Sequence, residues 1–554
     1  MKEDQLRQKP FDLSESDVSW VKETRDGLSL EEKVGQLFVV VQKPFSPEPE
    51  DLLSIKPGGI HLFAFSPDAT KVNQQAKIVE MQSCSKLPLL VSGDLESGGF
   101  GGAIDGTNLG MNMQVAAAGR PELALAFGKG IEAEGAAIGF NWVFGPVLDI
   151  NYNYQNPIVN TRAFGDTPEI VESYAIPVME GVQNGRRMAA CVKHWPGDGM
   201  DDRDQHKVLT VNSMPMQQWR ETYGRVYRSA FDAGVKSVMS AHIALPAYYK
   251  ELGIDDIRKQ HTPGSLSYEL NVKLLREELG FNGLIISDAS AMVGMTSWGP
   301  RNEIVPGCIA SGVDMFLFTE DLKYDYEAML QGVKAGIITE ERLNDAVTRV
   351  LALKASLGLH LERPALQDLA SVGSIEHVTL AQELARNSVT LVKDTQNLLP
   401  ISPEKHKRVL LIAIGSEGSL FTENGAGGSG FEKMLVEEGF EVVRNYHLKQ
   451  DENDIDLVIY LTQRSPGFMQ NSLRLSPEEA GGIFTWYPTY VPTMLISLGN
   501  PYTLYEMPTM PTMINGYNAS AIVQREILNC LLGNQPFLGT SPVDAFCGSA
   551  WAQL

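Results

Sequence analysis

Short apolar runs alternate with longer segments of helical periodicity through the first two thirds of the chain. The runs that read as buried strands lie at residues 38–41, 57–63, 87–94, 142–149, 188–192, 235–242, 283–288 and 313–318. The helical segments between and after them include residues 72–83, 123–138, 170–184, 216–233, 272–279 and 340–357. A strand followed by a helix, repeated in this way, is typical of a parallel sheet with crossover helices. About eight such units in about 360 residues predict an α/β fold, a (β/α)8 TIM-like barrel.

A second, smaller α/β domain follows the barrel. Its predicted strands lie at residues 408–414, 457–461 and 494–498, with helices between them. We therefore divide the chain into a barrel at 1–360, a linker at 361–379 and a C-terminal domain at 380–554.

A glycine-rich stretch at 425–430 lies between a strand and a helix of this second domain. Such a stretch can hold a phosphate at a helix N-terminus, but it fits neither the dinucleotide nor the nucleotide-binding pattern. A flexible loop is the simpler interpretation.

Polar side chains stand where several of the predicted barrel strands end. These residues are Asp94, Asp149, Lys193, His194, His242 and Asp288. A single acid in such a place usually caps a helix or forms an ion pair. The carboxyl ends of barrel strands meet on one face, where active sites of this fold are built, so several polar residues there predict a site.

The loop at 193–206 contains the pair Asp204 and His206. A carboxylate two residues from an imidazole can fix its tautomer and stabilise its charged form, and such a histidine can act as a general acid near neutral pH. Alone, the pair is also compatible with a solvated, charged loop.

The whole loop resembles that of family 3 glycoside hydrolases of the β-N-acetylglucosaminidase branch, K-H-[FW]-P-G-[HD]-G-x4-D-x-H. The matching positions are Lys193, His194, Pro196, Gly197, Gly199, Asp204 and His206. The resemblance implies that His206 is the general acid and base, held by Asp204, and that both lie on the barrel rather than on the second domain.

Residues 280–288 resemble the nucleophile motif of the same family, G-F-x-G-x-[IV]-[IV]-[ST]-D, which places the nucleophile at Asp288. Alone, a Ser-Asp pair after a strand is more often a helix cap than a nucleophile. Retaining glycoside hydrolysis needs a nucleophile and a proton donor, and Asp288 and His206 supply this pair. The small residues after Asp288 leave room for a sugar ring beside Met292, a candidate substrate contact.

The resemblance also implies that the remaining candidate residues bind the sugar. Asp94 corresponds to an acid that binds ring hydroxyls, and Arg162 matches the arginine of N-P-x-[IV]-x-x-R-x-[FY]-G. Lys193 and His194 are expected to bind hydroxyls as well. The resemblance covers residues 28–360 as the barrel and 380–545 as an α/β sandwich domain.

Two departures from the family pattern concern the leaving group. The common segment D-x-E-G-G-R is here D-L-E-S-G-G-F, with an extra serine and no arginine, from Asp94 to Phe100. Asp198 stands where a histidine is more frequent. Both predict altered leaving-group specificity rather than altered chemistry at the anomeric carbon.

Composition excludes some function classes. The formal net charge of −22 and the lack of a basic patch argue against nucleic acid and anionic membranes as partners. We find no apolar signal core at the start and no run long enough for a membrane helix. Five widely spaced cysteines suggest reduced thiols without metal-ligand spacing. We therefore expect a cytoplasmic enzyme without metal or cofactor; the sequence does not predict its oligomeric state.

The expected function is that of a retaining exo-β-N-acetylglucosaminidase. It would remove terminal β-linked GlcNAc from chitin oligosaccharides or peptidoglycan fragments through a covalent glycosyl–Asp288 intermediate. Phosphorolysis of the same intermediate is one alternative. A second is β-glucosidase activity, against which the Asp204–His206 pair argues. A third is a catalytically inactive sugar-binding protein, against which intact Asp288 and His206 argue.

Overall fold

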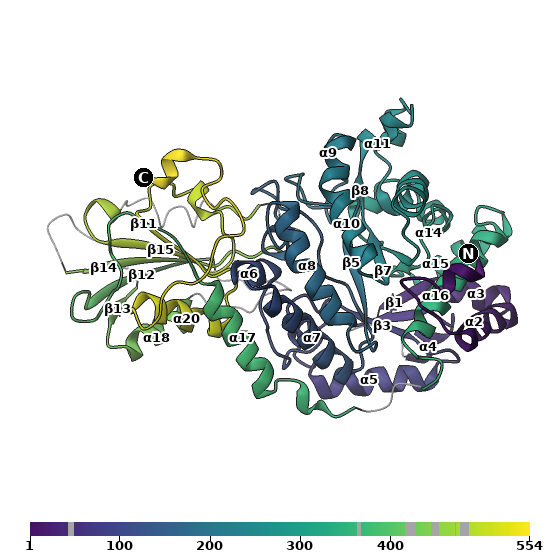
Figure 1. Ribbon diagram of the computed structural model, residues 1–554, viewed down its shortest axis with the longest axis horizontal. Helices are drawn as coiled ribbons and strands as arrows, with labels where there is room; N and C mark the ends of the chain where they lie inside the picture. Colours follow the sequence, from purple (N-terminus) through teal and green to yellow (C-terminus); the bar gives the residue numbers. More distant parts are fainter. Residues whose placement is uncertain (42–48, 363–366, 416–427, 445–453, 471, 477–486) are drawn as a thin grey trace.

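The computed structural model describes residues 1–41, 49–362, 367–415, 428–444, 454–470, 472–476 and 487–554. Two bodies lie side by side along the long axis of the molecule, a barrel and a smaller sheet domain (Figure 1). The predicted fold class, a (β/α)8-type barrel followed by a smaller α/β domain, is confirmed.

Eight parallel strands form the barrel in the order β10-β1-β2-β3-β4-β5-β7-β9. They are β1 (Phe38–Val41), β2 (Gly59–His61), β3 (Leu90–Gly93), β4 (Trp142–Val143), β5 (Ala189–Trp195), β7 (Ser237–Ser240), β9 (Leu284–Ser287) and β10 (Phe316–Leu317). A parallel bridge between Ile286 and Met315 joins the two ends of this order and closes the barrel. Each of the eight apolar runs of the sequence overlaps one of these strands.

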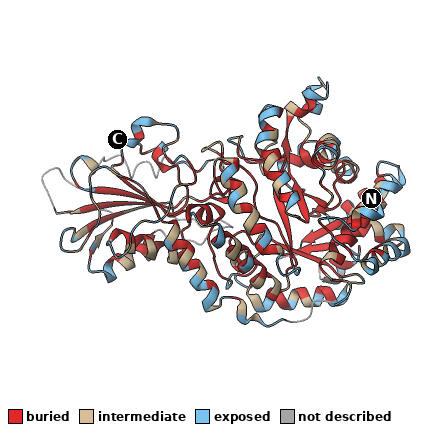
Figure 2. Cartoon of the chain, viewed as in Figure 1, coloured by how far each residue is buried: buried red, intermediate tan, exposed pale blue. Residues whose placement is uncertain are grey.

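Amphipathic helices surround the strands. The longer ones are α2 (Glu15–Gly27), α5 (Lys71–Cys84), α7 (Pro121–Ile138), α8 (Pro168–Gln183), α10 (Tyr223–Asp232), α14 (Arg301–Ala310), α15 (Leu322–Lys334) and α16 (Glu340–Ser356). Their inner faces are buried and their outer faces exposed, whereas the strands are buried throughout (Figure 2). Local signals set several starts: Ser29 and Glu32 form a capping box on α3 (Leu30–Gln36), and Pro121 and Pro168 occupy first turns.

Two predicted helices differ from the structure. The helix expected at 216–233 is broken at Thr222 into α9 (Met216–Glu221) and α10. Side chains on both sides of the break are tied to the 193–206 loop, because Trp219 Nε1 donates to the carbonyl of Pro196 at 3.0 Å and Tyr223 Oη donates to that of Asp198 at 2.6 Å. The helix expected at 272–279 begins earlier, at Glu269, and has π-type bonding to Glu278.

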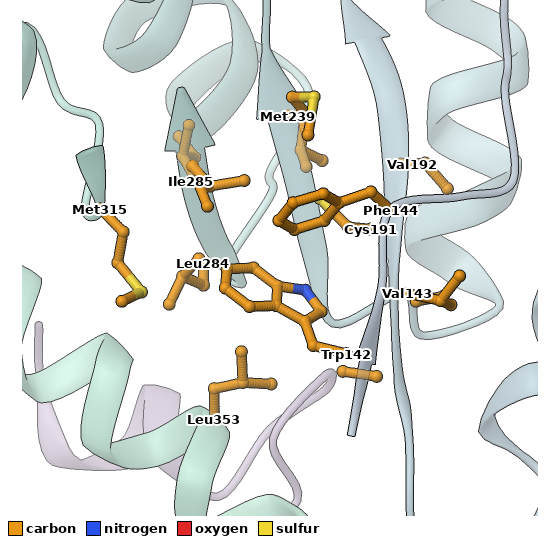
Figure 3. Close-up of a cluster of buried hydrophobic side chains, with 14 of the residues drawn as sticks. Trp142, Val143, Phe144, Cys191, Val192, Met239, Leu284, Ile285, Met315 and Leu353 are labelled. Atoms are coloured by element: carbon orange, nitrogen blue, oxygen red, sulfur yellow. The ribbon is translucent and has the colours of Figure 1, made fainter. Parts of the chain in front are cut away.

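The barrel interior is filled by large apolar side chains from its strands. Trp142 and Phe144 lie at its centre, with Cys191, Leu284 and Met315 around them (Figure 3). The indole Nε1 of Trp142 donates to Ser237 Oγ at 2.7 Å, which satisfies its buried polar group. The packed interior is a rigid base beneath the strand ends.

The second domain is built on a six-stranded sheet in the order β11-β16-β15-β14-β12-β13. The strands are β11 (Thr390–Asp394), β12 (Arg408–Ile414), β13 (Glu441–Val443), β14 (Leu457–Thr462), β15 (Thr493–Ser497) and β16 (Thr512–Asn515). All pairs are parallel except β11 with β16. Helices α17 (Ile375–Ser388), α18 (Ser429–Glu437) and α20 (Ala521–Leu531) accompany the sheet (Figure 1).

The boundary at 361–379 stays a prediction. Helix α17 begins at Ile375, inside the range expected as a linker, and its residue Leu384 still belongs to the apolar core of the barrel. The core of the second domain begins at Ala385. Across the described residues, every helix is too short or too polar to span a lipid bilayer, and the five cysteines are free thiols.

Candidate active site

A cavity of about 880 Å³ opens at the carboxyl ends of the barrel strands. It lies within the usual size range of ligand pockets, roughly 300–1,000 Å³. Seven of the candidate residues line it: Asp94, Arg162, Lys193, His194, His206, Asp288 and Met292. The eighth, Asp204, is 2% exposed and lies behind His206. Residues predicted from four separate motifs are thus brought to one place.

Asp288 follows directly on strand β9. Its carboxylate Oδ1 accepts the N–H of Ala289 at 2.7 Å, and its own N–H donates to the carbonyl of Ser240 at 2.8 Å. Burial alone would raise the pKa of Asp288, but the charges of His194, His242 and His206 outweigh it and hold that pKa below its usual value. The carboxylate is therefore ionised at neutral pH, as a nucleophile must be.

Asp204 and His206 form the hydrogen-bonded pair that the sequence predicted. His206 Nδ1 lies 2.7 Å from Asp204 Oδ1, which also accepts the N–H of His206 at 2.9 Å. A carboxylate accepts only, so the proton of this bond sits on Nδ1. Nε2 is left to gain and lose a proton, and the His206 side chain is 28% exposed toward the cavity. This is the arrangement of a general acid and base.

Lys193 and His194 lie within strand β5, which runs on to Trp195 beyond the apolar run that marked it in the sequence. The imidazole of His194 is oriented by Asp149, a fully buried acid, through a 2.6 Å contact between Nδ1 and Oδ2. Asp149 Oδ1 accepts the N–H groups of His194 and Asp198 as well. Asp149 therefore acts through His194, since it does not line the cavity.

Glu96 is a site residue that the sequence reasoning missed. Its carboxylate takes a bidentate pair from Arg162, at 2.8 and 3.0 Å, and contacts Lys193 Nζ at 2.6 Å. Burial would raise the pKa of Glu96, but the two cations outweigh it and hold that pKa well below its usual range. Asp94, 3.3 Å from Lys193 Nζ, keeps 29% of its side chain exposed at the cavity. Glu96 thus holds the cations while Asp94 faces the substrate space.

Replacing Glu96 with glutamine is expected to reduce both stability and turnover. The change leaves Arg162 and Lys193 buried against one carboxylate instead of two, and breaking a buried pair in this way costs about 3–5 kcal/mol. Thermal and denaturant unfolding, with kcat/KM on an aryl glycoside, measure the effect. Glu251→Gln, which removes an ion pair with Arg220 on a 46% exposed side chain, is the matched control and should cost about 1 kcal/mol at most. Equal stability of the two variants would contradict the role of Glu96.

The second domain reaches the site through residues 467–470, which line the cavity. The N–H of Met469 donates to Asp204 Oδ2 at 2.8 Å, and the ring of Phe468 lies 5.7 Å from the imidazole of His206. No pattern in the sequence pointed to this segment, because it lies some 260 positions from the residues it contacts. Of the glycine-rich stretch at 425–430, residues 425–427 lie outside the described residues, and Gly428 precedes α18.

The two departures from the family pattern lie in different places. Asp198 is buried beneath the site, where its Oδ1 accepts from Asn156 and from the N–H of Gly199. Burial, and after it the charge of Asp149, raises the pKa of Asp198 well above its usual value. Phe100 lines the cavity itself. Of the two departures, Phe100 is therefore the one in position to contact a substrate.

His61 and His242 are two further buried histidines near the strand ends. His61 stacks on Phe144 with ring centroids 5.2 Å apart and lines the cavity; burial lowers its pKa to about 4. His242 bonds Ser265 Oγ and the carbonyl of Ala289, which steadies the backbone after Asp288. Within the described part of the chain, no group of three or more acidic, cysteine or histidine side chains has the arrangement of a metal site.

Comparisons with known proteins identify the family of this chain. Residues 29–353 match the model of the glycosyl hydrolase family 3 N-terminal domain. A β-N-acetylglucosaminidase/β-glucosidase of Cellulomonas fimi is 39% identical over 97% of this chain and 98% of that protein. The structure of a β-glucoside phosphorylase, BglX, bound to 2FGlc superposes with a TM-score of 0.92 at 35% identity, covering 99% of this chain and 100% of that one.

A family 3 β-N-acetylglucosaminidase from Paenibacillus sp. str. FPU-7 is similar in structure, with a TM-score of 0.80 and 26% identity over 94% of this chain and all of that one. The match to the family model covers more than half of the chain and includes all eight strands of the barrel. This chain is therefore a member of glycosyl hydrolase family 3, and it is a glycosidase.

Proposed function

We propose that this glycosidase is a retaining exo-β-N-acetylglucosaminidase that acts through a covalent glycosyl–Asp288 intermediate. The observation that carries the proposal is the presence, in one cavity, of an ionised carboxylate and of a histidine backed by a buried acid. Such a pair supplies the nucleophile and the proton donor that retention requires.

In the first step Asp288 attacks the anomeric carbon and forms a glycosyl ester, while the bond to the leaving oxygen breaks. His206 gives the proton on Nε2 to that oxygen, and Asp204 stabilises the imidazolium before the transfer. In the second step His206 takes a proton from water, the water oxygen attacks the anomeric carbon, and Asp288 leaves. The two inversions give net retention.

The polar floor of the cavity supports recognition of a terminal sugar. Asp94 offers acceptors for ring hydroxyls, and Lys193, Arg162 and His194 offer donors around it. N-acetylglucosamine as the terminal sugar is supported by the Cellulomonas fimi and Paenibacillus relatives, whose names include β-N-acetylglucosaminidase. Chitin oligosaccharides and peptidoglycan fragments are the two candidate sources of that sugar.

Phosphorolysis is a second candidate for the fate of the same intermediate. The similar β-glucoside phosphorylase of known structure favours it. A histidine beside the anomeric carbon in the second step would also permit phosphate to attack in place of water. A neutral imidazole repels an incoming anion less than a carboxylate does.

A paired rate assay tests the proposal. We would measure p-nitrophenyl β-GlcNAc and p-nitrophenyl β-glucose, each with and without inorganic phosphate, and identify the sugar products. Preference for GlcNAc with a rate indifferent to phosphate is the expected result. A rate that rises with phosphate and yields GlcNAc-1-phosphate would replace hydrolysis by phosphorolysis. Preference for glucose would contradict the proposed sugar, and no turnover of either would favour the binding-protein alternative.

A further inference from the structure

The cavity extends beyond the anomeric centre to a wall made by both domains. On the barrel side its outer lining includes Phe63, Ala64 and Phe65, and on the other side it includes residues 467–470 of the second domain. A volume of about 880 Å³ is near the upper end of the range for pockets that enclose a drug-sized ligand. The cavity therefore has room for more than one pyranose ring.

The second-domain side of this wall is held in place by hydrogen bonds. Residues 467–470 follow strand β14, whose continuation is fixed where the carbonyl of Arg464 accepts the N–H of Asn500 at 2.6 Å. Asn500 Oδ1 in turn accepts from Asn160 of the barrel at 3.0 Å, at a buried contact between the domains. At the far end, the N–H of Met469 is bonded to Asp204. The segment is thus bonded directly to the barrel at Met469, and the chain just before it is connected to the barrel through Asn500.

Phe468 presents a large apolar face beside the proton donor. Its ring contacts the imidazole of His206 at a tilt of 38°, yet 42% of the residue stays exposed. Because His206 must reach the glycosidic oxygen, the group on the other side of that oxygen has to lie next to the same imidazole. Phe468 is therefore placed against the leaving group rather than against the sugar that is transferred.

The barrel side offers a second aromatic face. Phe63 and Phe65 stack with centroids 4.4 Å apart at 20°, and Phe63 packs edge-on against His61 at 4.5 Å. This row leads from the buried floor to Phe65, which is 53% exposed at the cavity. Two exposed phenylalanines in one cavity are costly to leave in water and become favourable when an apolar ring face covers them.

We infer that Phe65 and Phe468 form the subsite for the leaving group, and that this subsite takes an uncharged ring such as the second pyranose of an oligosaccharide. The inference rests on the proposed function. The lysine and arginine among the described lining residues are Lys193 and Arg162, and both are paired with Glu96 on the cavity floor. The described wall thus offers aromatic faces rather than cations to the leaving group. Of the two candidate sources of GlcNAc, this favours the uncharged chitin oligosaccharides.

The test compares three substrates of the same sugar: β-GlcNAc fluoride, whose leaving group has no ring, p-nitrophenyl β-GlcNAc, and N,N′-diacetylchitobiose. Phe468→Ala should lower kcat/KM for the two ring-bearing substrates about tenfold, which is the scale of one aromatic contact. It should leave the fluoride within about twofold, and Phe468→Tyr should restore the loss. Val436→Ala, which trims a 54% exposed side chain on α18 of the same domain, controls for an unspecific effect.

Each contrary outcome has its own meaning. An equal loss on the fluoride, or a loss on chitobiose with a shifted pH profile and none on the nitrophenyl glycoside, would overturn the subsite and make Phe468 a positioning residue for His206. No loss on any substrate would also overturn it. A wild-type preference for a peptidoglycan disaccharide bearing a carboxylate would contradict the uncharged ring. If the wild type turns over none of the substrates, it is the proposed function that fails.

Discussion

Asp288→Ala is expected to lower kcat/KM by about 10⁴-fold or more on every glycoside, whatever its leaving group, because removal of a nucleophile removes the covalent step itself. Asp288→Asn should lose a similar factor while keeping the shape of the side chain and an acceptor for the N–H of Ala289. Steady-state rates on p-nitrophenyl β-GlcNAc and on chitobiose measure the loss, and an unchanged unfolding temperature of the asparagine variant shows that the fold survives.

The alanine variant also permits a positive test of the nucleophile. The space left by the carboxylate can admit azide, which would attack the anomeric carbon directly and release the activated leaving group. The product is then the α-glycosyl azide, formed with one inversion rather than two. Rates restored by azide together with this product identify Asp288 as the nucleophile. Turnover of the alanine variant near the wild-type rate would show that the nucleophile is another residue.

The barrel could be predicted from the sequence because each of its strands appears there as a short apolar run. Runs such as 38–41 and 284–286 are buried on both faces, so they are apolar at every position, and the helices between them have one apolar face. The carboxyl ends of the strands could not be placed as well from the sequence. Polar Lys193 and His194 belong to β5, because the barrel interior at its carboxyl end is the active site and not an apolar core.

The breaks in helices were not predictable in the same way. The interruption at Thr222 accompanies Trp219 and Tyr223, whose polar atoms are bonded to the loop at 193–206. In sequence both residues suit an uninterrupted amphipathic helix. Their partners become visible only when the loop has been placed in space.

The candidate site likewise contains residues that linear motifs reveal and residues that only the folded structure reveals. Asp288, Asp204 and His206 lie in linear motifs, so a resemblance could find them. Glu96 lies only two residues from Asp94, and that spacing was a usable signal, yet its burial between two cations depends on the fold. Phe468 carries no signal, because it belongs to a segment that meets the barrel only after both domains have formed.

His206→Ala is expected to have an effect that depends on the leaving group. A phenolate that leaves without a proton needs no acid, whereas the alkoxide of a second sugar does, so kcat/KM should fall about 10²–10⁴-fold for chitobiose. For 2,4-dinitrophenyl β-GlcNAc the fall should be small, because kcat/KM reports the first step and that step no longer needs proton transfer. Rates on a series of aryl glycosides whose phenol leaving groups decrease in acidity measure how the loss depends on the leaving group.

The rate of the second step, hydrolysis of the glycosyl ester, distinguishes proton transfer by His206 from a purely structural role. Without a base, water attacks the glycosyl ester slowly, so kcat of the histidine variant on the dinitrophenyl substrate should fall, with a burst of phenolate as the ester accumulates. Azide needs no base and should restore kcat. Asp204→Asn keeps the imidazole but removes the charge 2.7 Å from Nδ1, and it should show the same leaving-group dependence to a smaller degree. An equal loss on all leaving groups, with no burst and no azide effect, would mean that His206 shapes the cavity and transfers no proton.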